Sequence, residues 1–376
     1  MIKIIHLIST LDRGGAETSL HRLVSNMDKY RFRNIVVSLK NVGPVGKEIQ
    51  RNCISVFPLN MKKGFPDPRG IMPFSKILNE FEPHIIQTWL YHANLFGILF
   101  KHKAKILWNI RCSNMDLKRY GTIYRWTVKL GALFSYIPHV VISNSRTGRM
   151  IHEEMGYEPA RWEIIPNGFD RDIFKPNPIA RKNIRKTLRI PADAFVIGCI
   201  ARFDPMKDHR NLIKAASLLL KTNPAVHFIL AGKGVTHDNL CLNKYHINSC
   251  NIDQFHLLGE RDDIPQILAA VDIASSTSSF GEGFPNNIGE AMSTGVPCVV
   301  TDVGDSANIV NTTGIIVPAK NPEALAYAWQ SLNNAGLGVI KKMGKKARQR
   351  IEKFYNMESM IQNYEAIYQK YASNIT

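Results

Sequence analysis

Short apolar runs and helix-length segments alternate along most of this chain. The first run, residues 2–8 (IKIIHLI), leads through Gly14-Gly15 into a helical pattern. Runs that are apolar at every position are typical of parallel strands covered on both faces. The pattern predicts further strands at 35–39, 54–59, 85–88, 106–110 and 140–143, with helices at 16–28, 69–81 and 119–135.

The alternation breaks near Phe174 and then starts again. The segment Lys175-Pro176-Asn177-Pro178 predicts a non-helical interruption, because proline restricts the residue before it. Beyond it, the pattern predicts strands at 196–200, 227–231, 255–258, 273–275, 298–301 and 315–317, and helices at 209–221, 263–270, 286–293 and 357–373.

Two such halves predict an α/β protein of two tandem, doubly wound, Rossmann-like domains, at residues 1–175 and 176–356, facing each other across a cleft. Ligands are expected at the carboxyl ends of the strands. The length of 376 residues agrees, because single cores stop growing at about 250–300 residues. With 45% apolar and 21% charged residues, the composition is that of a globular protein.

The sequence also indicates the cellular compartment in which the protein is expected. Six scattered cysteines form no CxxC pair and no metal-ligand spacing, which favours buried thiols in a reducing environment. The first apolar run is short and is soon followed by Asp12 and Arg13, which argues against a signal peptide, and no run reaches the ~18 apolar residues of a spanning helix. We therefore expect a cytoplasmic protein that is soluble or bound to a membrane only at its surface.

Positive charge is concentrated in the first half. The net charge is +17, and residues 1–175 carry +12 of it, with clusters at Lys62-Lys63 and in the run Lys101-His102-Lys103-Ala104-Lys105. Such a surface attracts anionic lipid, nucleic acid or phosphorylated substrates, or it only keeps the protein in solution. The clusters lack interleaved aromatic residues, which disfavours a nucleic-acid-binding function.

Two acids eight positions apart give the strongest chemical signal. In FGEGFPNNIGEA (280–291), Glu282 lies in a loop and Glu290 about one turn inside a predicted helix. The amides at that helix N-terminus suit a phosphate, a loop carboxylate can hold sugar hydroxyls, and a carboxylate in the first turns can accept hydrogen bonds from a ribose diol. The two acids can equally serve the helix N-terminus alone.

Two cations follow the first strand of the second half. Arg202 and Lys207 are expected at its carboxyl end, where they can neutralise a diphosphate; the alternative is a pair of surface cations. In the first half, Gly14 and Gly15 either let the backbone approach a ligand closely or form a simple tight turn. They do not belong to a GxGxxG dinucleotide fingerprint.

These motifs together resemble the large retaining glycosyltransferase family 4, of the bacterial surface-polysaccharide type. The motifs are Gly14-Gly15, Pro166-Asn167-Gly168-Phe169-Asp170, Arg202 with Lys207, and Glu282-x7-Glu290. The resemblance covers nearly the whole chain. It implies the GT-B fold, a nucleotide-sugar substrate with no metal or other cofactor, and a last helix, about 357–376, that completes the first domain.

The resemblance also implies a role for each matching position. Arg202 and Lys207 would hold the donor diphosphate. Glu290 would bind the nucleotide ribose, and Glu282 the hydroxyls of the transferred sugar. Amides around Phe284, Asn286 and Asn287 would contact the sugar and phosphates, and the Gly14-Gly15 loop would approach the diphosphate.

One position departs from the family. Many members have a histidine after an inner strand of the first domain, and this chain has Arg111 there. A cation opposite the diphosphate has an electrostatic use, so we predict a catalytic role for Arg111, with His92 as a second candidate on the acceptor side. Asp170-Arg171-Asp172 spells the DxD metal motif of another glycosyltransferase fold, but its place after Pro166-Asn167-Gly168 favours a turn, and no metal site is predicted.

The expected enzyme is a retaining hexosyltransferase, or another glycosyltransferase, that uses a UDP-sugar or a GDP-sugar. Its expected acceptor is a glycan or a polyprenyl-diphosphate-linked glycan at the anionic inner face of the cell membrane, as in capsule or lipopolysaccharide synthesis. A nucleotide-sugar epimerase, a phosphorylase on the same fold and a non-catalytic sugar-nucleotide-binding protein are the alternatives. The two cations with the two acids favour transfer, and the chain has no pyridoxal-lysine signature.

Overall fold

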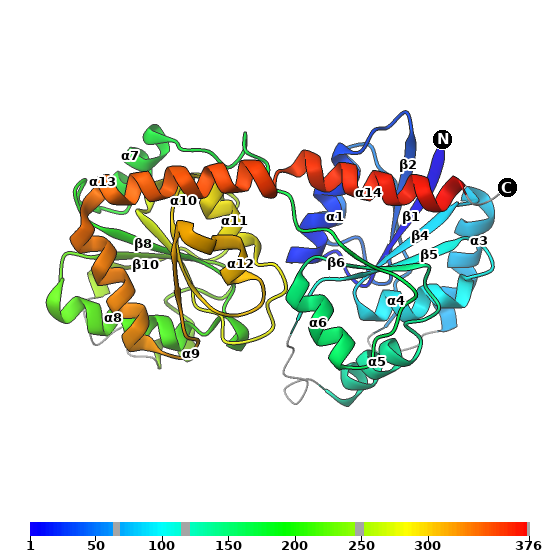
Figure 1. Cartoon of the computed structure of the whole chain (residues 1–376), viewed down its shortest axis with the longest axis horizontal. Helices are drawn as coiled ribbons and strands as arrows, with labels where there is room; N and C mark the ends of the chain where they lie inside the picture. Colours follow the sequence, from blue (N-terminus) through cyan, green and yellow to red (C-terminus); the bar gives the residue numbers. More distant parts are fainter. Residues whose placement is uncertain (63–67, 114–120, 245–251, 374–376) are drawn as a thin grey trace. The chain divides into compact units, whose positions relative to one another are not determined.

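The computed structural model divides the chain into two compact units. The first unit contains Met1–Gly168 and Met357–Thr376, and the second contains Phe169–Asn356. The structure describes residues 1–62, 68–113, 121–244 and 252–373. Each unit contains one parallel sheet with helices packed against it, which confirms the predicted α/β class (Figure 1).

The elements of the first unit are β1 (Ile2–Ile8), α1 (Gly15–Asn26), β2 (Phe32–Ser38), α2 (Gly43–Arg51), β3 (Val56–Pro58), η1 (Pro68–Gly70), α3 (Ile71–Phe81), β4 (Ile85–Trp89), α4 (Tyr91–Gly97), η2 (Ile98–Phe100), β5 (Lys105–Ile110), α5 (Thr122–Leu133), β6 (Val140–Ser143), α6 (Arg146–Glu154), β7 (Trp162–Ile164) and α14 (Met357–Ala372). The sheet order is β3-β2-β1-β4-β5-β6-β7. Ile4 and Ile8 of β1 pack with α1, α2 and α14, whereas Ile5 and Leu7 pack with α3, α4 and α5. Covering on both faces explains the continuous apolar runs.

The elements of the second unit are α7 (Pro178–Thr187), β8 (Val196–Ile200), η4 (Pro205–Lys207), α8 (His209–Thr222), β9 (His227–Ala231), α9 (Leu240–Asn243), η6 (Ile252–Gln254), β10 (Phe255–Leu257), α10 (Ile264–Ala270), β11 (Ile273–Ser276), α11 (Asn286–Ser293), β12 (Cys298–Thr301), α12 (Ser306–Val310), η7 (Asn311–Thr313), β13 (Ile315–Val317) and α13 (Pro322–Phe354). The sheet order is β10-β9-β8-β11-β12-β13. Helix α8 and the first part of α13 cover one face, and α7, α10, α11 and the last part of α13 cover the other. Helix α13 is kinked at Gly336, whose φ is +78°.

The boundary between the units differs from the prediction. The first unit ends at Gly168 rather than at residue 175. Phe169 and Phe174 are buried in the apolar core of the second unit, and the Phe169 amide donates to the Tyr355 carbonyl at 2.9 Å. Burial of these two aromatic side chains explains why the division precedes the proline segment.

That proline segment is non-helical over residues 175–177, as predicted, and a helix begins at its last residue. Helix α7 begins at Pro178, where the missing amide would have no partner inside the helix anyway. The Asn177 side chain caps the helix by accepting from the Ala180 amide at 2.9 Å. The predicted break is therefore confirmed, and the sequence pattern missed only the helix that begins at Pro178.

The last helix packs on the first unit. Met360, Tyr364 and Tyr368 of α14 are buried in the same core as β1 and α1. Figure 1 shows α14, at the red end of the chain, beside the blue α1. Within the parts of the chain that the structure describes, no helix has the length and apolar character needed to cross a membrane.

Candidate functional site

The second sheet reverses its direction of winding between β8 and β11. The chain moves outward from β8 through β9 to β10, and then outward on the other side through β11, β12 and β13. Strands β8 and β11 are parallel neighbours, with Ala274 opposite Gly198. Segments that leave their carboxyl ends diverge, and doubly wound sheets bind ligands at such a point.

Lys207 and Glu282 meet at this edge. Lys207 ends η4, which follows β8, and Glu282 lies in the loop after β11. Their side chains form an ion pair in which Lys207 is 13% and Glu282 is 7% exposed. Ser278 Oγ donates to the same Glu282 Oε1 at 2.6 Å. Lys207 and Glu282, which the sequence predicted for one site, therefore lie in direct contact. Ser278 also belongs to this cluster, although it lies outside the motifs from which the site was predicted.

The backbone around Glu282 is held from the next strand. Gly304 has a φ of +61°, and a Cβ at this position would lie 2.2 Å from the Glu282 carbonyl oxygen. The Asp305 amide donates to the Gly283 carbonyl at 3.0 Å, and Thr301 Oγ1 donates to the Ser278 carbonyl at 2.6 Å. These contacts within the protein hold the Glu282 loop in position, so the loop does not depend on a bound ligand for its conformation.

Helix α11 begins directly after this loop. Its N-cap residue, Pro285, makes no side-chain capping bond, so the first amides, at Asn286 and Asn287, suit an anion. Asn287 Oδ1 is buried without a hydrogen-bond partner among the described residues. Glu290 is half-buried in the second turn of the helix.

Phe284 is a packing residue in this loop. Its buried ring lies 6.2 Å from Phe169 in a stacked arrangement and 5.3 Å from Tyr355 edge-on. Gly289 of α11 makes room for Phe169, because a Cβ at Gly289 would lie 2.1 Å from that ring. Phe169, the aromatic residue of the Pro166-Asn167-Gly168-Phe169-Asp170 motif, therefore packs against both α11 and the loop that precedes it.

Arg202 lies at the same edge but forms a different contact. Its side chain is 49% exposed, and Nε donates to Asp204 Oδ2 at 3.1 Å. Asp204 also accepts from the Met206 amide at 2.9 Å. The direct contact seen among the predicted donor residues is that of Lys207 with Glu282, whereas Arg202 is bonded to its sequence neighbour.

The first sheet reverses its winding in the same way, between β1 and β4. Gly14 and Gly15 follow β1 and begin α1. A Cβ at Gly14 would lie 2.4 Å from Oε2 of Glu17, a buried acid in the first turn of α1. Gly14 thus makes room for Glu17, whose only signal in the sequence was an acid just inside the helix.

A cavity of about 310 Å³ lies at the carboxyl edge of the first sheet. The residues that line it include some that follow β1, β2 and β4 and one from α5: Ser9, Thr10, Lys40, Leu90, His92 and Tyr124. Leu90 has φ +72° and ψ 156°, a conformation that residues other than glycine rarely adopt. Residues in such conformations are found most often at functional sites.

His92 lies in this cavity on α4. Burial lowers the pKa of His92 below 6.5, and the nearby Lys40 cation lowers the pKa further. The imidazole is therefore neutral at pH 7, so that one ring nitrogen can accept a proton. His92 therefore lines a cavity of the first unit, and its predicted acceptor-side role stays a prediction.

Arg111 follows β5 and is bound into a polar network. Its Nη2 donates to Asn167 Oδ1, and its Nη1 donates to Tyr364 Oη at 3.4 Å. Its guanidinium lies 5.4 Å from the centre of the Trp89 ring. Burial lowers the pKa of Arg111, and Tyr364 and Glu17 oppose this shift. The structure therefore gives Arg111 a role in holding α14 to the sheet, and its predicted catalytic role stays a prediction.

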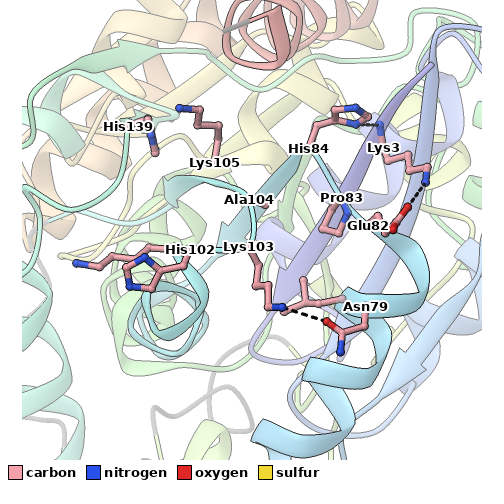
Figure 2. Close-up of a pocket in the computed structure, with 12 residues that line it drawn as sticks. Lys3, Asn79, Glu82, Pro83, His84, His102, Lys103, Ala104, Lys105 and His139 are labelled. Atoms are coloured by element: carbon pink, nitrogen blue, oxygen red, sulfur yellow. Dashed lines mark hydrogen bonds and ion pairs between the residues drawn. The ribbon is translucent and has the colours of Figure 1, made fainter. Parts of the chain in front are cut away.

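The predicted basic run lies at the opposite edge of the first sheet. Lys101, Lys103 and Lys105 line a hollow of about 700 Å³, and Lys3 and His139 line it with them (Figure 2). These residues lie at or near the amino ends of β1, β5 and β6, whereas the cavity with His92 lies at the carboxyl ends. Lys63 of the other basic cluster lies outside the described residues.

The Asp170-Arg171-Asp172 sequence forms a turn. Asp170 Oδ1 accepts from the amides of Asp172 and Ile173 at 2.8 and 3.0 Å. Across residues 1–62, 68–113, 121–244 and 252–373, no group of three or more His, Cys, Asp or Glu side chains is placed to hold a metal ion.

Comparisons with known proteins agree with this arrangement. A family model described as Glycosyltransferase Family 4 matches residues 13–173, and one described as Glycosyl transferases group 1 matches residues 194–334. A protein of Bacillus subtilis (strain 168) that carries the name "Putative glycosyltransferase EpsF" is 24% identical over 80% of this chain and 79% of its own length. The UDP-Gal:alpha-D-GlcNAc-diphosphoundecaprenol alpha-1,3-galactosyltransferase of Escherichia coli is also 24% identical, over the same shares of the two chains.

Solved structures share the fold. Anabaena HepE, in complex with UDP and glucose, has a TM-score of 0.86 at 21% identity, covering 98% of this chain and all of its own. Sucrose-phosphate synthase from Thermosynechococcus elongatus has a TM-score of 0.81 at 17% identity, covering 98% of both chains. Two doubly wound units of this kind define the GT-B class of fold. The chain belongs to glycosyltransferase family 4 and is a glycosyltransferase.

Proposed function

We propose that this glycosyltransferase moves a sugar, with retention of anomeric configuration, from a nucleoside-diphosphate donor bound to the second unit. The observation that carries the proposal is the Lys207–Glu282 ion pair at the β8–β11 switch point, next to the N-terminus of α11. A cation, a fixed carboxylate and helix amides at one sheet edge suit a diphosphate joined to a sugar.

The reaction breaks the bond between the anomeric carbon and a diphosphate oxygen. The acceptor hydroxyl oxygen attacks the anomeric carbon from the face that the diphosphate leaves, and its proton passes to the leaving phosphate oxygen. Lys207, Arg202 and the α11 amides stabilise the growing negative charge, and the loss of one such group can cost ~3–4 kcal/mol of barrier. We propose that these cations and amides stabilise the leaving diphosphate without a divalent metal ion.

The two acids have different proposed roles. Glu282 accepts hydrogen bonds from the hydroxyls of the transferred sugar, because its loop is fixed by Gly304 and Asp305. Glu290 accepts from the ribose diol, because it stands in the second turn of α11, behind the amides that hold the phosphates. This division leaves neither acid as a covalent nucleophile.

For the donor base we favour uridine. The Escherichia coli relative is named for UDP-Gal, and HepE has been solved with UDP-glucose. Guanosine is the second candidate, because a Mycobacterium tuberculosis mannosyltransferase that is 27% identical over 45% of this chain is named for GDP-mannose. Either base leaves the proposed diphosphate and sugar contacts unchanged.

For the acceptor we propose a glycan on a polyprenyl diphosphate, at the anionic inner face of the cell membrane, in surface-polysaccharide assembly. The name of the Escherichia coli relative supports this class, since it specifies a diphosphoundecaprenol acceptor. The cavity beside His92 supports it as well, because Lys40 and Lys62 line it together with apolar side chains. A cation can hold the acceptor diphosphate, and neutral His92 can accept a hydrogen bond from the attacking hydroxyl.

The deciding experiment is a thermal-shift screen with UDP- and GDP-sugars, followed by nucleotide release with and without a lipid-linked acceptor. We expect a UDP-sugar to raise the Tm, and nucleotide to be released in step with a glycoside whose anomeric configuration is retained. An epimerase would convert the sugar nucleotide with no acceptor present, and a non-catalytic binder would shift the Tm without releasing nucleotide. Either result would replace the proposal.

A further inference from the structure

Helix α5 presents a row of large apolar side chains to solvent. Ile123, Trp126 and Leu133 are 57%, 59% and 63% exposed, and Tyr136, just past the helix, is 65% exposed. The three helical residues share one face of α5. The opposite face supplies the core contacts of the helix, through Thr127, Val128 and Gly131.

The charged residues of α5 and of the segment that follows it are basic. From Gly121 to His152 the sequence contains no aspartate or glutamate, and its arginine and lysine residues are Arg125, Lys129, Arg146 and Arg149. Lys129 Nζ lies 5.5 Å from the centre of the Trp126 ring. An indole next to a cation, on a helix without acids, fits the region between lipid headgroups and acyl chains.

We propose that α5 lies in the plane of an anionic lipid bilayer. Ile123, Trp126 and Leu133 enter the boundary between headgroups and acyl chains, and Arg125 and Lys129 contact lipid phosphates. The inference rests on the proposed lipid-linked acceptor and assigns the surface through which the enzyme reaches it.

The position of Tyr124 connects this surface to the acceptor cavity. Tyr124 stands between Ile123 and Arg125 in α5, it lines the cavity of about 310 Å³, and its ring centre lies 6.1 Å from that of His92. A bilayer against α5 therefore places the cavity next to the lipid surface. A lipid-linked glycan can reach His92 without its polyprenyl chain leaving the membrane.

The lysine-lined hollow is the competing surface in this unit (Figure 2). It lies at the amino edge of the sheet, and the seven residues of β1 separate that edge from the carboxyl edge. Seven residues at ~3.3 Å each amount to roughly 20 Å between a bilayer at the hollow and the acceptor cavity. Helix α5 also has the apolar row, so we assign the bilayer to α5.

Vesicle sedimentation tests the assignment with charge-matched variants. The full chain is mixed with phosphatidylcholine vesicles that contain or lack phosphatidylglycerol. The test variant combines Arg125→Glu with Lys129→Glu. One control combines Lys341→Glu with Lys345→Glu on α13, which has the same four-residue spacing, and the other combines Lys101→Glu with Lys103→Glu in the hollow; these four lysines are exposed.

We expect the α5 variant to bind anionic vesicles at least about tenfold more weakly, because each basic residue near such a surface contributes to attraction. Both controls should stay within about twofold of the unchanged protein. Trp126→Ser with Leu133→Ser should weaken binding without a change in charge. Brominated lipid should quench the tryptophan fluorescence of the unchanged protein, and this quenching should be lost in Trp126→Phe. Equal losses in all three charge variants, or a loss confined to the hollow variant, would overturn the assignment.

A parallel measurement separates this inference from the proposed function. Each variant is tested for a UDP-sugar thermal shift, which involves the second unit and needs no lipid. Normal shifts with no vesicle binding in the unchanged protein would reject the α5 surface and leave the donor proposal intact. Vesicle binding through α5 without any sugar-nucleotide shift would reject the donor proposal instead.

Discussion

Lys207 and Glu282 form an ion pair although they are 75 positions apart in the chain. They follow the neighbouring parallel strands β8 and β11, and their opposite charges neutralise each other in a largely buried position. A buried pair of this kind gains little net stability, because both charges lose their hydration. A donor that offers a diphosphate to the lysine and hydroxyl groups to the acid provides new partners for both, which favours a functional reason for the pair.

Removal of Lys207 should damage both stability and turnover. In Lys207→Ala the Glu282 carboxylate stays buried without its cation, which costs about 3–5 kcal/mol of unfolding free energy. Turnover should fall by ~10²–10³-fold in the protein that remains folded, because a group that stabilises the leaving diphosphate is lost. Urea unfolding and nucleotide release measure the two effects.

Glu282→Gln is the matched control for this prediction. It keeps the shape of the side chain and can keep the Ser278 hydrogen bond, but it removes the charge. We expect a smaller loss of stability than in Lys207→Ala, with a raised KM for the sugar donor. Near-normal turnover in folded Lys207→Ala would refute the diphosphate role.

Arg202 should behave differently, because its side chain is exposed and pairs with Asp204 at the surface. Arg202→Ala should change the unfolding free energy by less than about 0.5 kcal/mol. UDP affinity measured by calorimetry should nevertheless fall about tenfold or more, since a charged hydrogen bond to phosphate is lost. Asp204→Ala is the control, because it frees Arg202 without removing the cation, and unchanged UDP affinity in Arg202→Ala would exclude Arg202 from the site.

Gly304 should be essential because of backbone geometry. In Gly304→Ala a φ of +61° is unfavourable, and the new Cβ would lie 2.2 Å from the Glu282 carbonyl oxygen. The Glu282 loop must move, so donor KM should rise about tenfold or more and stability should fall by about 1–3 kcal/mol. Gly338→Ala is a suitable control, because nothing lies within 4 Å of a Cβ there. Equal donor KM in the two variants would contradict the prediction.

Most of the strands and most of the longer helices were predictable from the sequence, because they depend on local pattern. The predicted helices at 16–28, 69–81, 119–135, 209–221, 263–270 and 357–373 correspond to α1, α3, α5, α8, α10 and α14, with bounds that differ by a few residues at most. The apolar runs at 196–200, 227–231, 298–301 and 315–317 and the helix at 286–293 agree with the bounds of β8, β9, β12, β13 and α11. Other elements gave no clear apolar pattern: the helices at 43–51, 91–97, 146–154, 178–187 and 322–354 and the edge strand at 162–164.

The candidate site was predictable only as a set of residue types at one sheet edge. The order of the strands places Lys207 and Glu282 together, and the family motifs contain both. The partners of Arg202 and Arg111 depend on rotamers and on the packing of α14, which no local pattern encodes. Glu17 and Ser278 were missed for the same reason.

Arg111 offers a test of structural against catalytic function. Tyr364→Phe removes the hydroxyl that accepts from both Arg111 and Asn109 but leaves the guanidinium in place. If Arg111 acts on the reaction, Arg111→Met should lower turnover at least about tenfold more than Tyr364→Phe does, although both lower the Tm. Parallel losses of Tm with equal turnover would leave Arg111 a purely structural residue.

The first unit should lose stability in mild acid through buried histidines. Burial lowers the pKa of His6 and the pKa of His152 from 6.5 to about 4. His6 Nε2 bonds Asn34 Oδ1 at 3.0 Å, and Nδ1 accepts from the Trp89 indole at 3.4 Å, so the neutral ring fits and a second proton does not. His152 is likewise held by Tyr91 and the Gly148 carbonyl.

The sign of this effect follows from proton binding. Below pH 6.5 the unfolded chain binds protons that the folded unit does not accept until about pH 4. The unfolding free energy is therefore undiminished above pH 6.5 and falls as the pH drops toward 4, by up to about 3 kcal/mol for each histidine. Urea unfolding at pH 7 and pH 5 should show this fall. The fall should be smaller in His152→Phe and unchanged in His102→Gln, whose side chain is exposed. The same unfolding free energy at both pH values would show that these histidines are not the acid-sensitive groups.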